Sequence, residues 1–472
     1  VAIADDITMG FLLADAAVRG RDLAKAGVSN AYAKADRIGR PVSYMFMPAT
    51  VQEYDEDNEP MVYELVTPLW GEEPAGYEWD VKLNHVLTKE IGMHKAEGVP
   101  ALYYIETELG DVRMVKIVDD LIFSESPATK RSLQRGILKM LKAAFNDEVK
   151  FEEEPTSIAG ILVERPLDRS TLTISMPDKI DEAVREFLPE ILDGSKPDRI
   201  LTGKALQDAA DALRLPADQP MPMPKAGKRV QQALGKLKFP EKRCIPALTL
   251  VLHRLSCVMK YPPPEATLVI DSVLYMAYQH RGDGITYSRH SLEGQVDLTA
   301  QAAYKYDLDA PAPIDMTASG DASTGHYNVY ANVLMYGGGC IYHCVKKIGS
   351  IVDSIMRAEM VATQKCSELI EYATTIERGF GLERHHPVPL ATDNLGNKQV
   401  VKYEGSAARS RHFLVRYDAI KMREEQGIIC TQHVPDEHMP ADFLTKWVGL
   451  QKLRRCLAYV TNSRMLQQTS KK

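Results

Sequence analysis

The C-terminal third of the chain alternates between two hydrophobic periodicities. Residues 354–378 carry apolar or small side chains every three or four positions, which predicts a long amphipathic helix that ends at Gly379. Shorter apolar segments bounded by turn residues predict strands. The strand segments are 314–321, 327–336, 341–345, 388–392 and 427–434. A second helix is expected at 410–427 and a last one near Pro440, so strands and helices alternate as in an α/β domain.

The rest of the chain is expected to form two further domains. Acidic residues and prolines interrupt the regular patterns near 151–156, and two prolines do so again near 308–313. We therefore predict domains at 1–150, 151–312 and 313–472. A chain of 472 residues is long enough for about three cores of ordinary size.

Composition indicates a folded, intracellular protein. Hydrophobic residues make up 45% and charged residues 26% of the sequence, values typical of globular rather than disordered chains. No apolar run approaches the roughly 18 residues of a membrane span, and the N-terminus lacks a secretory signal pattern. The seven cysteines are odd in number, which favours reduced thiols. Cys340 and Cys344 flank His343, but a zinc site needs four ligands and no second close pair is present, so we interpret them as strand residues.

Charge is distributed unevenly along the chain. The net charge of -7 argues against a general nucleic-acid coat, yet residues 225–243 and 446–472 are basic. Such runs are most often a solvated surface. Basic surface beside carboxylates would also suit a phosphodiester substrate.

Four acidic residues fall where predicted elements begin, end or face the sheet. Asp321 ends the first strand of the C-terminal block, Glu359 lies beside the apolar stripe of the long helix, and Asp393 follows the fourth strand. Asp442 opens the final helix. Hard divalent cations prefer oxygen ligands, and two such ions about 4 Å apart can activate a water and stabilise a leaving oxygen. The pattern therefore predicts a two-metal nuclease site.

Each of these acids has a simpler interpretation when taken alone. Most Asp residues at strand ends or helix starts form turns or caps, and Asp442 by itself would be a cap. Glu359 is harder to explain in that way, because Ala358 and Ala362 place its flank against the sheet. An unpaired charge there is costly unless it binds something.

Five segments resemble, in order, the RNase H motifs of copia-type LTR retrotransposon polyproteins. They are ASGDAS (318–323), SIMRAEMVA (354–362), ATDN (391–394), SRHFLVRYDAIKMREEQG (410–427) and MPADFLTKWV (439–448). The resemblance implies that the catalytic ligands of two Mg²⁺ or Mn²⁺ ions are Asp321, Glu359, Asp393 and Asp442. Arg411-His412 aligns with a Lys-His pair of that family, so His412 is expected either on the substrate side or in product release, or else in ordinary packing.

The resemblance extends upstream to a reverse transcriptase. The segment MVKIVDDLIF (114–123) predicts a hairpin with the polymerase-like pair Asp119 and Asp120 at its tip. It resembles the Tyr-x-Asp-Asp motif of a polymerase palm, with Ile117 in place of Tyr. The family supplies a third carboxylate in a segment resembling residues 16–35, and this chain has Gly27 at that position. We therefore expect RNA-directed DNA polymerase activity to be impaired.

The resemblance implies a multidomain protein of α/β and α+β class. A palm-like domain, a thumb and connection region, and an RNase H-like domain with a mixed five-stranded sheet are expected in that order. The implied activity is hydrolysis of RNA in RNA–DNA hybrids. An RNA template, a DNA primer, and a second copy of the chain or another polyprotein segment are the further partners expected, with no membrane. The implied location is a cytoplasmic virus-like particle or the nucleus, and the chain is expected to be a fragment or a decayed copy.

Two alternatives stay open. The chain could be a catalytically inactive relic that only binds nucleic acid or has a structural role. An integrase-like transposase is less favoured, because that class uses two Asp followed by a Glu, whereas Glu359 comes second here.

Overall fold

The computed structural model describes residues 3–216, 223–289, 304–325, 327–350, 352, 354–394 and 411–463, with the backbone alone for 411–414. The chain is mixed α/β, as expected, and the described residues form several sheets. It divides into two compact units, Val1–Asp5 with Arg21–Pro155, and Asp6–Gly20 with Thr156–Lys472. The domain boundaries predicted at 150/151 and 312/313 stay predictions.

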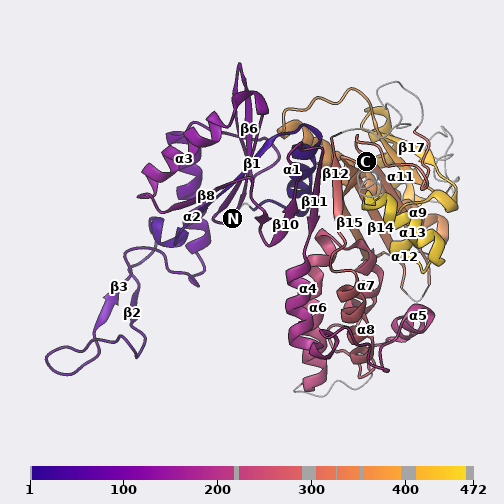
Figure 1. Ribbon diagram of the computed structural model, residues 1–472, viewed down its shortest axis with the longest axis horizontal. Helices are drawn as coiled ribbons and strands as arrows, with labels where there is room; N and C mark the ends of the chain where they lie inside the picture. The colour runs from indigo at the N-terminus through magenta and orange to yellow at the C-terminus, as the bar shows by residue number, and fades with distance from the viewer. Residues whose placement is uncertain are drawn as a thin grey trace. The chain divides into compact units, whose positions relative to one another are not determined.

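The first unit is built on an antiparallel six-stranded sheet with the order β4-β5-β6-β7-β1-β8 (Figure 1). The strands are β1 (Asp22–Val28), β4 (His94–Lys95), β5 (Leu102–Thr107), β6 (Gly110–Ile117), β7 (Asp120–Glu125) and β8 (Val149–Glu153). Helices α2 (Ala75–His85) and α3 (Ser132–Ala144) pack their apolar residues into its core. A short ribbon of β2 (Tyr44–Phe46) and β3 (Val62–Glu64) completes the unit.

The predicted hairpin at 114–123 is confirmed. Ile117 pairs with Asp120 across the turn between β6 and β7. Val118 in this turn has a φ of 57°, which is unusual for a β-branched residue. Its carbonyl accepts a hydrogen bond of 2.9 Å from the indole of the buried Trp79, a contact that helps to hold the strained turn.

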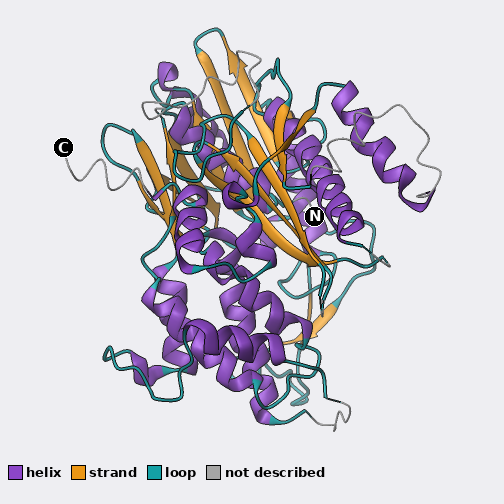
Figure 2. Cartoon of the chain, turned by 90° about the vertical axis from the view of Figure 1, so that its right-hand side faces the viewer, coloured by secondary structure: helices purple, strands orange, loops and turns teal. Residues whose placement is uncertain are grey.

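The second unit contains a four-stranded antiparallel sheet and a helical bundle. The sheet has the order β12-β11-β10-β9, formed by β9 (Ser157–Ile158), β10 (Ile161–Glu164), β11 (Thr171–Ser175) and β12 (Ile285–Ser288). The bundle consists of α4 (Pro177–Phe187), α5 (Gly203–Ala212), α6 (Lys225–Arg243), α7 (Thr249–Cys257) and α8 (Ala266–Gln279). Figure 2 shows these helices gathered as a layer of their own. The basic segment 225–243 is α6, which buries its apolar side and exposes most of its lysines.

The same unit holds a mixed five-stranded sheet with the order β15-β14-β13-β16-β17. Its strands are β13 (Thr317–Ser323), β14 (Val329–Tyr336), β15 (Gly339–Lys347), β16 (Val388–Thr392) and β17 (Ile429–His433). The first three strands pair antiparallel, and β16 runs parallel to both β13 and β17. Helix α9 (Ile355–Gly379) packs on the sheet, and α11 (Arg411–Glu425) packs on α9 through the Arg423–Glu371 ion pair of 2.6 Å. All five strands and both helices expected in this region are present.

The last predicted helix begins at Asp442, as expected. It is interrupted, with a single turn α12 (Asp442–Thr445) followed by α13 (Leu450–Val460). The break occurs because Lys446 is extended, with φ and ψ of -140° and 155°. Its ammonium group reaches back to Asp442 at 3.1 Å.

Helix α1 (Asp6–Val18) belongs to the second unit, although the sequence-based division placed it with residues 1–150. It is apolar on nearly every face and is buried from Ile7 to Ala17. Phe11 stacks on Tyr336 of β14 with 4.5 Å between ring centroids. Gly10 allows close approach to β15, because a Cβ there would lie 2.5 Å from a backbone oxygen.

Candidate metal centre

The parallel pairing of β13 with β16 places Asp321 and Asp393 at the same end of the five-stranded sheet, where these two neighbouring strands finish. Ser319 of β13 pairs with Ala391 of β16 in a parallel ladder, so residues that follow these two positions emerge at the same ends of their strands. Helix α9 packs on β13, and Glu359, near the N-terminus of α9, faces this end of the sheet. The amide of Ala322 donates a hydrogen bond of 3.1 Å to Glu359 Oε1, which fixes the carboxylate beside Asp321.

Carboxylate oxygens lie close together in two overlapping groups at this end of the sheet. Asp321, Glu359 and Asp393 each offer an oxygen within 4.8 Å of the others, and so do Asp393, Asp436 and Asp442. Asp393 is shared by both groups. Within the described residues these are the arrangements of His, Cys, Asp and Glu suited to holding a metal ion. All four acids singled out in the sequence are therefore brought together, while their role as metal ligands stays a prediction.

Most of these carboxylates are buried. Asp321 and Asp442 are 0% exposed and Glu359 is 3% exposed. Asp321 Oδ2 accepts a hydrogen bond from the Thr445 hydroxyl. The other oxygens, Asp321 Oδ1 and Glu359 Oε2, are buried and find no hydrogen-bond donor in the part of the chain that the structure describes. Because an unsatisfied buried carboxylate oxygen is strongly unfavourable, the donor set fits a hard divalent cation.

Mutual repulsion and burial shift the titration of the group. Burial raises the pKa of Asp321 well above its usual range, and the neighbouring Asp442 carboxylate raises it further. Burial, followed by the charges of Asp321 and Asp393, likewise raises the pKa of Glu359. Without a cation this site therefore favours protonated carboxyl groups, and a bound cation would favour the charged form.

Two lysines neutralise the second carboxylate group. Lys446 Nζ lies 3.1 Å from Asp442 Oδ1 and 3.2 Å from Asp436 Oδ1. Lys452 of α13 contacts Asp442 and also lies 2.8 Å from Asp436 Oδ2. Hydrogen bonds from these two lysines lower the pKa of Asp436 to about 2. A cation that entered this second group would have to displace both ammonium groups.

Sequence reasoning did not assign Asp436, Thr445 or the two lysines to the site. Thr445 and Lys446 lie in the segment 439–448 whose resemblance marked Asp442, and Asp436 lies just before it. Their nearness to Asp442 in the sequence was the available signal. Lys452 comes from the next helix and had no local signal. The side chain of His412 lies outside the described residues, so its predicted role is untested.

The polymerase-like pair lies in the first unit, at the tip of the β6–β7 hairpin. Burial, followed by the charge of Asp119, raises the pKa of Asp120. Gly27 of β1 pairs directly with Asp120 in the antiparallel ladder, and a Cβ built on it would lie 3.1 Å from Asp120 Oδ1. Asp22 forms an ion pair of 2.9 Å with Arg131, and Asp36 one of 3.2 Å with Lys82. The position at which the resemblance implies a carboxylate is thus beside Asp120, and Asp22 and Asp36 are engaged elsewhere.

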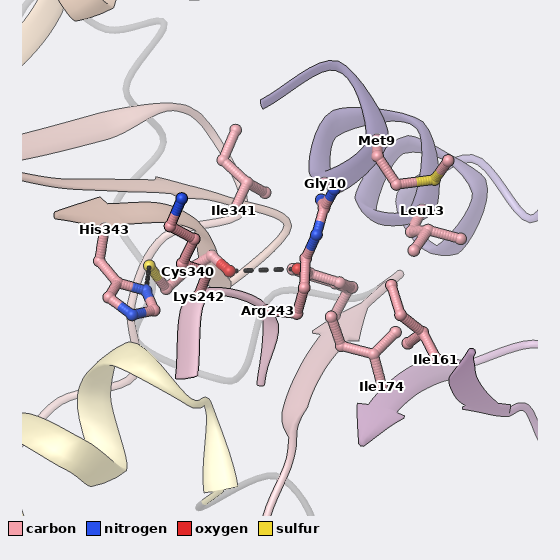
Figure 3. Close-up of a pocket in the computed structure, with 11 residues that line it drawn as sticks. Met9, Gly10, Leu13, Ile161, Ile174, Lys242, Arg243, Cys340, Ile341 and His343 are labelled. Atoms are coloured by element: carbon pink, nitrogen blue, oxygen red, sulfur yellow. Dashed lines mark hydrogen bonds between the residues drawn. The ribbon is translucent and has the colours of Figure 1, made fainter. Parts of the chain in front are cut away.

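The Cys340–His343 segment lines a small pocket of the second unit (Figure 3). Cys340 Sγ lies 3.8 Å from His343 Nδ1, and Glu241 of α6 lies 3.7 Å from the other ring nitrogen. The pocket has a volume of about 10 Å³, room for about one water. Burial alone would lower the pKa of His343, but the side chains of Cys340 and Glu241 raise it above its usual value, which favours a buried ion pair between α6 and β15. This set is structural, and the cysteines described by the structure are free thiols.

Comparison with known proteins gives one informative likeness. No protein-family model matches the chain. Over 397 residues it is 22% identical to a protein of Arabidopsis thaliana named as the retrovirus-related Pol polyprotein from transposon RE2. The match covers 83% of this chain and 24% of that protein, so the chain spans about a quarter of its relative's length. The expected likeness to a retrotransposon polyprotein is confirmed at this level, and the finer assignments stay predictions.

The described helices include none long and apolar enough to cross a membrane.

Proposed function

We propose that this chain is a metal-dependent nuclease of copia-type retrotransposon origin, which hydrolyses the RNA strand of RNA–DNA hybrids. The observation that carries the proposal is the buried group of Asp321, Glu359 and Asp393, with two carboxylate oxygens left without hydrogen-bond donors among the described residues. The mixed sheet with α9 packed on it supports an RNase H-like fold for this part of the second unit. The likeness to a Pol polyprotein supports a nucleic-acid substrate.

The proposed mechanism assigns roles to this chain's own residues. Asp321, Glu359 and Asp393 would hold one Mg²⁺ or Mn²⁺ ion, and Asp393 with Asp442 a second. Bound divalent ions supply an activated water and stabilise the negative charge of the leaving 3′ oxygen. Thr445 orients Asp321 by its hydroxyl hydrogen bond, and Asp393 belongs to both carboxylate groups. Asp393 would therefore couple the two cation positions.

Selectivity for RNA would come from the substrate's shape. Proteins distinguish RNA from DNA through contacts with 2′-hydroxyl groups, which line the wide minor groove of an A-like duplex. An RNA template and a DNA primer are the partners proposed for the first unit. Because Gly27 offers no ligand beside Asp120, we propose that DNA synthesis is impaired and that Asp119 and Asp120 are a relict pair.

The alternative is an inactive relic that binds nucleic acid without cleaving it. One observation favours it: Lys446 and Lys452 already neutralise Asp442 and Asp436 without any metal ion. If the ammonium groups stay in place, the second cation position is blocked and turnover is lost. The two proposals therefore differ in cleavage and agree in binding.

The test is cleavage of an end-labelled RNA–DNA hybrid by the purified protein in Mg²⁺ or Mn²⁺. We expect cuts in the RNA strand of the hybrid, no cuts in DNA duplex of the same sequence, and no activity in EDTA. Asp393→Asn removes a carboxylate shared by both groups and is expected to abolish cleavage. Absence of cleavage by folded protein, with binding of the hybrid retained, would reject the nuclease and leave the relic.

A further inference from the structure

A surface pocket of about 350 Å³ adjoins the carboxylate cluster in the second unit. Thr445 and Lys446 line the pocket and also contact the cluster, Thr445 through Asp321 and Lys446 through Asp442. The end of β13 and the loop after it form another wall, beginning with Ser323, two residues beyond Asp321. A molecule in this pocket would therefore lie next to whatever the carboxylates act on.

The remaining wall comes from the helical bundle rather than from the five-stranded sheet. Arg254 of α7, and Asp211 and Arg214 at the end of α5, face the same pocket as Trp447. Helix α7 contacts both α5 and α12, so the bundle and the candidate metal centre are packed together within the unit. The pocket thus combines residues from two regions that the sequence placed in different domains.

Asp211 holds the pocket's side chains in position. Its Oδ1 lies 3.0 Å from Arg254 Nε, and its Oδ2 accepts a hydrogen bond of 2.7 Å from the Trp447 indole. Arg214 donates a hydrogen bond of 2.7 Å to the Leu213 carbonyl, which keeps it at the end of α5. Asp211 thus orients two groups that can bind a ligand, the guanidinium group of Arg254 and the indole ring of Trp447.

The pocket has a positive balance of charge. Arg214 and Arg254 line it against the single carboxylate of Asp211, and Lys446, which also lines it, is paired with Asp442 and Asp436. Guanidinium groups bind phosphate oxygens through paired hydrogen bonds, and Trp447 and Tyr327 offer flat surfaces for a sugar or a base. The volume of about 350 Å³ is room for a phosphate and the adjoining ribose.

We infer that this pocket binds a backbone phosphate of the nucleic-acid substrate near the bond to be cut. The inference rests on the proposed function and adds to it that the helical bundle supplies cations, chiefly Arg254, to the nuclease site. A phosphodiester suits the positive charge of the pocket and its position beside the carboxylate cluster. The middle region of the chain is then part of the substrate-binding surface.

The experiment measures binding without cleavage. Fluorescence anisotropy of a labelled RNA–DNA hybrid in EDTA gives the dissociation constant of the whole chain at several salt concentrations. Arg254→Gln is expected to weaken binding roughly tenfold at low salt. It should also reduce the slope of log affinity against log salt by about one.

Two control variants separate a charge effect from a structural one. Arg254→Lys keeps the positive charge without the guanidinium group, so it should bind more tightly than Arg254→Gln and keep the wild-type dependence on salt. Arg281→Gln removes an arginine that is 40% exposed and stacks on Tyr278, away from the pocket, and should change binding little. If Arg254→Lys weakens binding and reduces the salt slope as much as Arg254→Gln, or if Arg281→Gln weakens binding as much, the inference is wrong.

The outcomes also separate this inference from the proposed function. Wild-type protein that cleaves the hybrid while Arg254→Gln binds it normally would overturn the inference alone. Arg254-dependent binding by protein that never cleaves would support the inference and reject the nuclease. Wild-type protein that does not bind the hybrid at any salt concentration would overturn both.

Discussion

Asp321→Asn is expected to reduce metal-dependent cleavage of the hybrid by about three orders of magnitude or more, because it removes a buried ligand at the centre of the first carboxylate group. The amide keeps the size of the side chain and can still accept the Thr445 hydrogen bond. Loss of activity would therefore reflect loss of charge rather than loss of packing. Single-turnover cleavage in saturating Mn²⁺ is the measurement.

The same substitution should stabilise the metal-free protein at neutral and higher pH. Burial and neighbouring carboxylates raise the pKa of Asp321 to about 8, above the value of about 4 in the unfolded chain. Between those values the folded state binds more protons than the unfolded state, so the free energy of unfolding falls as pH rises. The contribution of one such group is at most about 1.4 kcal/mol per pH unit. This loss is complete once the pH exceeds the raised pKa.

Urea unfolding in EDTA between pH 5 and pH 8 tests this stability effect. Wild-type protein should lose stability across the range, and Asp321→Asn should lose less. Asp418→Asn, on the exposed side of α11, is a matched control that should follow wild type. Wild-type stability that increases with pH, or a variant less stable than wild type at pH 8, would contradict the account of a repulsive carboxylate cluster.

Gly27→Asp is expected to produce primer extension by a protein that otherwise shows little or none. A carboxylate on β1 would enter the space beside Asp120, since the Cβ position already lies 3.1 Å from Asp120 Oδ1. Three carboxylates would then be available for divalent ions, as polymerisation requires. We expect extension at least ~10-fold above background in Mn²⁺, with lower stability in EDTA, because an added like charge is unfavourable there.

Gly27→Asn is the matched control for this prediction. It introduces a side chain of nearly equal size without the charge, so it should crowd Asp120 and leave extension at background. Extension by the natural protein at a rate comparable to Gly27→Asp would show that the palm-like site is functional as it stands. The proposed impairment would then be wrong.

The parts of the fold that sequence predicted well are those with local signals. Helix α9 and strands β13 to β17 follow from apolar periodicity and from turn residues such as Gly337. The break after α12 was not predicted, because the extended backbone of Lys446 follows from no periodicity in this segment. Docking of α1 in the second unit was missed for a similar reason, since an all-round apolar helix does not reveal its partner.

The candidate site shows the same division between local and long-range information. Sequence order and resemblance marked the four acids, but their convergence depends on the parallel pairing of β13 with β16 and on the packing of α9. Lys452, which reaches Asp442 from a different helix, had no detectable pattern. The position of Gly27 opposite Asp120 likewise follows from strand register, which local sequence does not specify.

Anomalous scattering from Mn²⁺ in crystals would show whether Asp321, Glu359, Asp393 and Asp442 form one divalent-metal centre. We expect one strong peak among Asp321, Glu359 and Asp393. A second peak is expected beside Asp393 and Asp442, with Lys446 and Lys452 displaced from Asp442. Crystals soaked in saturating Mn²⁺ that show no peak among these carboxylates, with both lysines still paired to Asp442, would contradict the account.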